Sequence, residues 1–262
     1  MRRPARPQTN LRAAALAVPS RARFNARMSP NLDYSTGLVS FVVFVYSTVC
    51  HEAAHAWAAL KLGDRTAYEG GQVSLDPTPH IRREPFGMVV VPILSFLLGG
   101  GLIGWASAPY DPAWAQRHPR RSAWMALAGP AANLALVLAA ALLIRLGLEW
   151  HIFTAPDFAD RTHVTDAVAG PVWAFAALVL SVVYSLNLLL CVFNLIPLPP
   201  FDGSAVAMLL MSENTASKYQ AFLAQGTLRF FGLFVAWKAL GVIFPAVFFP
   251  SLSLLYPGTH YR

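Results

Sequence analysis

The chain has 262 residues, of which 56% are hydrophobic and only 13% are charged. A soluble globular protein carries about a quarter charged residues because its surface faces water, so most of this surface must face lipid. The net charge of +7 would also suit a nucleic-acid-binding protein. The basic residues, however, stand at the ends of apolar segments, a placement that the positive-inside rule explains, and we expect no nucleic-acid partner.

Residues 1–35 are predicted to form a basic, disordered arm. Residues 1–32 contain seven arginines, and no acidic residue precedes Asp33. The stretch LRAAALAVPSRA is too short and too interrupted to be the apolar core of a signal peptide. A basic arm, an organellar transit peptide and an over-long assigned start all fit this composition, and the sequence leaves these alternatives open.

Five apolar segments follow, each close to the ~20 residues that a helix needs to cross the hydrocarbon core. They cover residues 37–62, 86–106, 122–146, 171–196 and 230–249. The second is interrupted by Pro92 and by glycines at 99–101, a composition that suits a re-entrant hairpin. We therefore expect an all-α polytopic membrane protein with about five hydrophobic spans, one of them a candidate re-entrant segment. A single transmembrane domain would cover 36–250, with a short tail over 251–262.

The charges of the connections predict the orientation of the spans. Connections 63–85 and 107–121 carry arginines and should be cytoplasmic, whereas 147–170 carries four acidic residues against Arg161 and should be external. If both basic connections lie on one side, segment 86–106 cannot be a simple crossing. The basic N-terminus would then be external, against the charge rule, so one of these assignments must be wrong.

The first segment contains a His-Glu-x-x-His motif at His51, Glu52 and His55. On a helix the two histidines lie four residues apart on one face, so both imidazoles can reach one metal ion. Glu52 is offset by one residue and is near enough to take a proton from a water at that metal. The alternative is a helix with satisfied core polar groups. Three ionisable groups in mid-membrane cost several kcal/mol without partners, which favours the metal.

Zinc needs a third protein ligand and an open position for water, and Asp202 is the candidate ligand. It is the only acidic residue at the end of the fourth segment, after Pro197, Pro199 and Pro200. The prolines break the helix there, and Gly203 permits a tight turn. An N-cap for the next helix is the alternative role of Asp202, but the upstream histidine pair favours the ligand.

These motifs carry a resemblance to a known family. HEAAH in one segment and NLIPLPPFDG at the end of a later one resemble the site-2 protease family of intramembrane zinc metalloproteases. The intervening AGPAANL, with Gly129 and Asn133, is similar to that family's Gly-x-x-x-Asn element. The segment after HEAAH resembles that of compact bacterial members, and the likeness covers roughly residues 37–210.

The resemblance implies the roles of the site residues. His51, His55 and Asp202 would bind one zinc ion per chain, Glu52 would be the general base and acid, and Asn194 would steady the oxyanion. Asn187 lies two helical turns before Asn194 on the same face. For both Asn187 and Asn133 we prefer interhelical packing through hydrogen bonds over a catalytic role.

The resemblance also implies the function. The chain would be a zinc metalloendopeptidase that cuts transmembrane or amphipathic protein segments within the lipid bilayer, in regulated intramembrane proteolysis. A bacterial plasma membrane is the expected location, with an organellar membrane as the alternative. The sequence leaves homo-oligomer formation open, and no PDZ-like or CBS-like regulatory domain fits among the spans.

The competing function is a non-enzymatic transporter or metal-binding membrane protein. Transporters usually show internal repeats and ionisable groups on several spans. This chain shows no repeat, and its membrane-embedded acidic groups are concentrated at Glu52 and Asp202.

Two stretches are candidates for holding an unwound substrate. Residues 66–79, expected to form a small β-like loop after the first span, and residues 104–112 (GWASAPYDP) are bounded by Gly or Pro. Either can offer an extended edge to which a substrate adds as a strand. The alternative for both is an ordinary solvated connection.

Overall fold

The computed structural model describes residues 33–99, 101–223, 227–259 and 261. The chain divides into two units, Met1–Asp33 and Tyr34–Arg262. Almost all of the predicted basic arm therefore lies outside the described residues. The second unit is predominantly helical, and its elements confirm the prediction of an all-α polytopic membrane protein.

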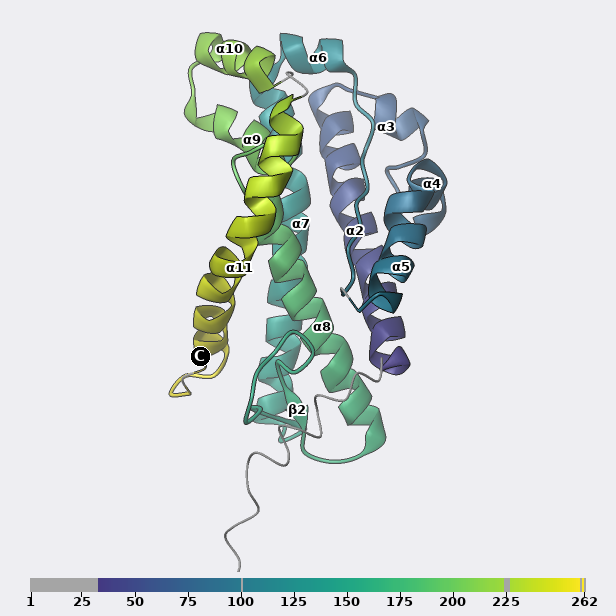
Figure 1. The fold of residues 1–262 in the computed structure, drawn as a ribbon, viewed down its shortest axis with the longest axis vertical. Helices are drawn as coiled ribbons and strands as arrows, with labels where there is room; N and C mark the ends of the chain where they lie inside the picture. The colour runs from purple at the N-terminus through teal and green to yellow at the C-terminus, as the bar shows by residue number, and fades with distance from the viewer. Residues whose placement is uncertain (1–32, 100, 224–226, 260, 262) are drawn as a thin grey trace, which may run out of the picture. The chain divides into compact units, whose positions relative to one another are not determined.

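Four helices in the described part are long and apolar enough to span a membrane (Figure 1). They are α2 (Tyr34–Leu62), α7 (Pro119–Glu149), α8 (Pro171–Asn194) and α11 (Thr227–Leu255). The shorter helices are α3 (Thr66–Glu69), α4 (Pro77–Arg83), the π-helix η1 (Phe86–Val90), α5 (Val91–Leu97), α6 (Pro112–Arg117), α9 (Asp202–Val206), the 3₁₀ helix η2 (Ala207–Leu210) and α10 (Glu213–Leu223).

The long helices differ in how much of their surface is packed, and each leaves large apolar side chains exposed. α7 packs against both α2 and α8, which also contact each other. α11 is the least buried of the four. It makes its contacts through residues at four-residue spacing, including Ala236, Phe244, Phe248 and Leu252, which is the period of one helix face. The large apolar residues on the remaining faces are exposed, as expected where the solvent is lipid.

The second apolar segment turns back and does not form a membrane-length helix. Its helical part, Phe86–Leu97, is shorter than a membrane span, and residues 101–111 then return in a non-helical path to α6 (Figure 1). α3, α4 and α6 consequently lie at the same end of the bundle. The re-entrant alternative therefore agrees with the structure, and both basic connections share one side.

This arrangement shows which part of the chain conflicts with the positive-inside rule. The acidic connection between α7 and α8 lies at the opposite end from α6, and α2 begins at that acidic end (Figure 1). The remaining conflict concerns only the arginines of residues 1–32, which lie outside the described residues.

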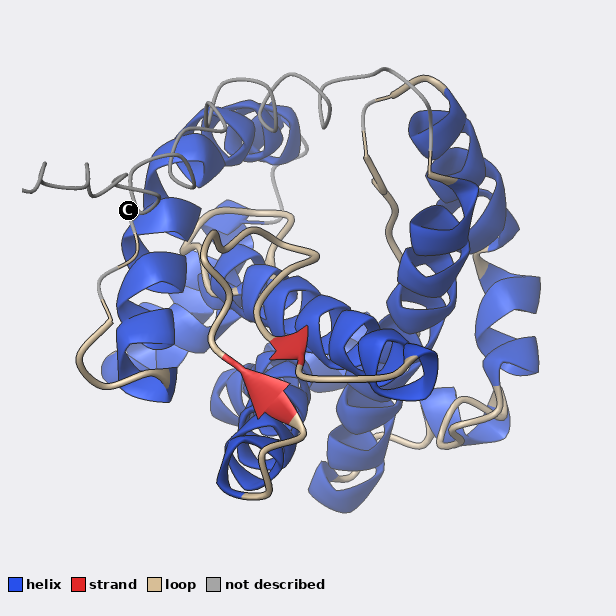
Figure 2. Ribbon diagram, turned by 90° about the horizontal axis from the view of Figure 1, so that it is seen from below, coloured by secondary structure: helices blue, strands red, loops and turns tan. Residues whose placement is uncertain are grey.

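The small sheet lies elsewhere than we expected. β1 (Phe153–Thr154) and β2 (Asp166–Ala167) pair antiparallel in the connection between α7 and α8 (Figure 2). The stretch after the first span, predicted to be β-like, instead contains α3 and α4. Asp76 explains the second of these helices, because its side chain accepts a hydrogen bond from the Thr78 amide and Pro77 occupies the first turn, a common helix start.

Asp64 links the end of α2 to residues 101–111, which we call the returning segment, through a hydrogen bond. Its buried carboxylate accepts hydrogen bonds from the amide and hydroxyl of Thr66, at 2.9 and 2.6 Å, and from the Asp111 amide at 2.9 Å. Burial alone would raise the pKa of this carboxyl, but the hydrogen bonds from Thr66 and Asp111 outweigh it and hold the pKa below its ordinary value. The ionised carboxylate therefore joins two connections at the same end of the bundle.

Gly87 allows the returning segment to lie directly on the re-entrant helix. The Trp105 amide donates to the Gly87 carbonyl at 3.1 Å. A Cβ at Gly87 would stand 2.3 Å from the Trp105 carbonyl oxygen, a backbone atom that cannot swing aside.

We predict that Gly87→Ala destabilises the protein by about 1–3 kcal/mol, because an added methyl group overpacks this contact. Gly241→Ala on α11 is the matched control, since its Cβ would meet nothing within 4 Å. Thermal unfolding of both variants in detergent checks this. Equal melting temperatures for the two variants would contradict the close approach at Gly87.

Candidate metal centre

α2 presents the His-Glu-x-x-His motif toward the interior of the bundle. His51, Glu52 and His55 are 6%, 6% and 7% exposed, in the second half of a 29-residue helix. The two imidazole rings meet edge to face with centroids 4.6 Å apart. The helical spacing therefore places both histidines on one face, as expected from their separation of four residues.

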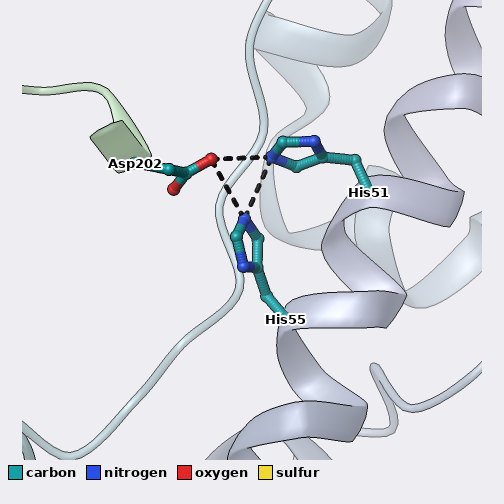
Figure 3. A group of neighbouring side chains, drawn as sticks. All are labelled: His51, His55 and Asp202. Atoms are coloured by element: carbon teal, nitrogen blue, oxygen red, sulfur yellow. Dashed lines mark hydrogen bonds and ion pairs between the residues drawn. The ribbon is translucent and has the colours of Figure 1, made fainter. Parts of the chain in front are cut away.

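Asp202 reaches the histidines from the other side of the cavity. α8 ends at Asn194, and the proline-rich residues 195–201 carry the chain to α9, where Asp202 is the first helical residue. The N-cap position belongs to Phe201, so the alternative N-cap role of Asp202 is not the one observed. Its side chain points toward the two histidines of α2 (Figure 3).

The three side chains converge on one point. Asp202 Oδ2 lies 3.1 Å from His51 Nε2 and 3.3 Å from His55 Nε2, and the two Nε2 atoms are 3.0 Å apart (Figure 3). Ligands about 2.05 Å from a tetrahedral zinc ion are themselves about 3.3 Å apart. The donor set and its spacing therefore fit zinc, and among the described residues it is the group of three or more His, Cys, Asp or Glu side chains that could hold a metal.

α7 lies directly against these donor atoms at Gly129. A Cβ at this position would come within 2.3 Å of His55 Nε2 and 2.5 Å of His51 Nε2. One turn earlier, the Met125 carbonyl oxygen accepts a hydrogen bond from His55 Nδ1 at 2.8 Å. This bond leaves the lone pair of His55 on Nε2, facing Asp202 and His51. The missing side chain at Gly129 leaves room beside the donor atoms.

Glu52 and Asn194 both line the cavity that contains the three donor atoms, a space of about 1000 Å³. Asn194 donates from Nδ2 to the Leu190 carbonyl at 3.0 Å, which leaves its second N–H group available. The lining also includes Tyr110 of the returning residues 101–111 and Gln220 of α10. The lining of the cavity is therefore partly polar, although the site lies beside membrane-length helices.

Two contributors to the site were not identified from the sequence. α10 lines the cavity through Ser217 and Gln220, but its short polar sequence gave no sign of proximity to HEAAH. The second is the role of Gly129, which was noted only as part of a motif. Its spacing of four from Asn133 was the available signal, since residues so spaced share a helix face.

Apolar membrane-length helices around two buried histidines and a partly buried aspartate define an integral membrane protein with a metalloprotease-type centre. The chain matches Peptidase family M50 over residues 39–237 and belongs to that family, the site-2 proteases that the paired motifs predict. The family and the relatives below make it an integral membrane metalloprotease.

Two bacterial relatives support this assignment. The chain is 29% identical over 217 residues to the "Putative zinc metalloprotease YwhC" of Bacillus subtilis, covering 82% of this chain and 89% of the relative. It is 31% identical over 163 residues to the "Putative zinc metalloprotease Rip2" of Mycobacterium tuberculosis, covering 62% of this chain and 53% of the relative. No solved structure matches the chain.

We predict that Gly129→Ala sharply reduces bound zinc, because the added methyl group would occupy the space next to both Nε2 atoms. Zinc per purified chain, measured by elemental analysis, checks this. Gly241→Ala is the matched control and should retain the wild-type zinc content. Full zinc occupancy in Gly129→Ala would show that the metal does not lie against α7.

Proposed function

We propose that this protein is a zinc-dependent intramembrane endopeptidase that hydrolyses peptide bonds in transmembrane or amphipathic segments of its substrates. The observation that carries the proposal is the convergence of His51, His55 and Asp202 beside Glu52, in a polar cavity flanked by membrane-length helices. Away from their ends, the described membrane-length helices carry acidic and histidine side chains only on α2, at His51, Glu52 and His55. This concentration favours hydrolysis over the transport of ions.

The proposed chemistry divides between the metal and the chain. His51, His55 and Asp202 would hold a zinc ion, which would supply Lewis-acid polarisation of water and of the scissile carbonyl. Glu52 accepts the proton of the attacking water and delivers it to the departing amine. Asn194 donates its second N–H group to the oxygen on which negative charge develops.

The returning segment is the proposed binding edge for the substrate backbone. A peptide bond within a helix is shielded by its own hydrogen bonds, so the substrate must be unwound before it is cut. Residues 106–110 line the cavity in a non-helical conformation. Among the described residues, the amides of Ala106 and Ala108 make no hydrogen bond, so they can pair with an added strand. The other candidate, residues 66–79, contains α3 and the start of α4, and its described residues are not among those that line the cavity.

The comparison with bacterial relatives also suggests which membrane the protein occupies and which partners it contacts. We place the protein in a bacterial plasma membrane, as the bacterial relatives suggest, with an organellar membrane as the alternative. Its direct partners would be the lipid bilayer and a protein substrate with a membrane-embedded segment. A homo-oligomer remains an open prediction.

We predict that Glu52→Gln retains zinc but cleaves about 10²–10⁴-fold more slowly, because a proton-transfer group is lost while the ligands remain. Cleavage of a single-span peptide by the purified protein, measured with zinc content, checks this. Glu69→Gln on the exposed face of α3 is the matched control and should match the wild type. Equal cleavage by Glu52→Gln and wild type would overturn the mechanism.

We predict that Asp202→Ala loses most of its zinc, because two histidines alone make an incomplete site. The control is Asp157→Ala, which removes an exposed carboxylate from the connection at the opposite end of the bundle and should bind one zinc per chain. A chelator should abolish cleavage by the wild type, and added zinc should restore it. Wild-type zinc content in Asp202→Ala would exclude Asp202 as a ligand.

A further inference from the structure

Two asparagines are buried between the membrane-length helices, beside the candidate metal centre. Asn133 on α7 and Asn187 on α8 are both fully buried, with 0% of either residue exposed. A buried amide without partners is strongly unfavourable in an apolar bundle. Both side chains should therefore be hydrogen-bonded, and their partners show what the two residues do.

The hydrogen bonds form a ring that starts and ends on α2. Ser47 Oγ accepts from Asn187 Nδ2 at 2.9 Å. Asn187 Oδ1 accepts from Asn133 Nδ2 at 2.9 Å, and Asn133 Oδ1 lies 2.6 Å from His51 Nδ1. Ser47 and His51 are one helical turn apart, so the ring ties three spans together at the metal ligand.

The direction of every bond in the ring follows from one backbone carbonyl. Asn187 Nδ2 also donates to the Val183 carbonyl oxygen at 2.8 Å, and a carbonyl oxygen can only accept. The Asn187 amide therefore presents Oδ1 to Asn133, so Asn133 must present Nδ2 in return. Asn133 Oδ1 is then left facing His51, whose Nδ1 must carry the proton.

This direction determines which nitrogen of His51 can bind a metal. With the proton on Nδ1, the lone pair is on Nε2. His55 is held in the same tautomer by the Met125 carbonyl. Two lone pairs 3.0 Å apart, with the Asp202 carboxylate 3.1 and 3.3 Å away, repel one another unless a cation lies between them.

We propose that Asn133 and Asn187 are positioning residues that fix the tautomer and orientation of His51 and thereby set the zinc affinity of the site. This proposal rests on the proposed function for the identity of the metal. Asn133 acts directly on His51, while Asn187 and Ser47 act by fixing which end of the Asn133 amide faces the imidazole. Outer hydrogen bonds of this kind typically change metal affinity about 10–100-fold.

One face of α7 contacts both histidines. Gly129 and Asn133 lie four residues apart on α7, one clearing the space beside Nε2 and the other holding Nδ1 of His51. This division of roles explains the Gly-x-x-x-Asn spacing by contacts to the ligands. A role limited to helix packing would not require Asn133 to present an acceptor to His51.

The direct test measures zinc affinity by competition with a chromophoric chelator. Asn133→Leu keeps similar volume but offers no acceptor, and we expect zinc to bind about 10–100-fold more weakly. Asn133→Asp keeps an acceptor toward His51 and should restore affinity to within about tenfold of wild type. Asn187→Leu and Ser47→Ala should weaken binding in the same direction but less, Ser47→Ala least.

Ser181→Ala provides the matched control for a loss of buried hydrogen bonds. Ser181 is a fully buried residue on α8 that accepts from the Val164 and Thr165 amides at 3.0 and 3.2 Å, and it makes no contact with the ring. This variant should lower the melting temperature with zinc affinity unchanged. The visible spectrum of the cobalt-substituted protein should change in Asn133→Leu but not in Ser181→Ala.

The outcomes separate this inference from the proposed function. If Asn133→Leu and Asn187→Leu bind zinc as tightly as wild type and give its cobalt spectrum, the positioning role is wrong, while cleavage by wild type and its loss in Glu52→Gln still support the protease. If Asn133→Leu does not fold, unchanged affinity in Ser47→Ala together with Asn187→Leu overturns the inference. If wild type binds no zinc, the proposed function fails first and the positioning role with it.

Discussion

Polar groups buried within a membrane must find their partners inside the protein, because the surrounding lipid offers none. In this chain His51, Glu52, His55, Asn133 and Asn187 all lie buried among apolar helices. Their arrangement follows from this constraint. Asn133 and Asn187 link His51 of α2 to α7 and α8 through hydrogen bonds. The Met125 carbonyl holds His55, and the Nε2 atoms of both histidines face Asp202. A cation at that point would complete the interactions of all three donor groups.

α7 is the helix on which this arrangement depends. It contacts both α2 and α8, and it presents three successive features toward the histidines. The Met125 carbonyl binds one imidazole, Gly129 leaves the space next to the donor nitrogens, and Asn133 binds the second imidazole. The spacing of four residues places these features on one face. A rigid helix can therefore orient both histidine ligands, which belong to α2.

Access to the site depends on segments that are not spans. The re-entrant helices η1 and α5 and the returning residues 101–111 occupy one side of α2, and α10 contributes to the cavity wall. Non-helical backbone at this depth is tolerated where it lines a polar cavity. These segments therefore place non-helical backbone along the cavity, where the proposed substrate strand would pair. Asp64 keeps the returning segment in place through its bond to the Asp111 amide.

The sequence by itself determined the membrane class, the four long helices and the metal-site candidates, because these depend on local composition and spacing. Apolar length predicts a span, and a separation of four residues puts His51 and His55 on one face whatever the fold. Asp76 followed by Pro77 was a local signal for α4 as well, although a β-like loop was expected there.

Only the tertiary structure decided how distant parts of the chain meet. The loop charges did not decide whether residues 86–106 cross the membrane. The structure shows that residues 101–111 turn back toward α6, which favours a re-entrant segment. Asn133 and Asn187 are 54 residues apart in sequence, so no local pattern could show that their amides meet or which end faces His51. Tautomer, donor direction and the space beside Gly129 are properties of contacts between helices, and such contacts exist only once the spans have packed.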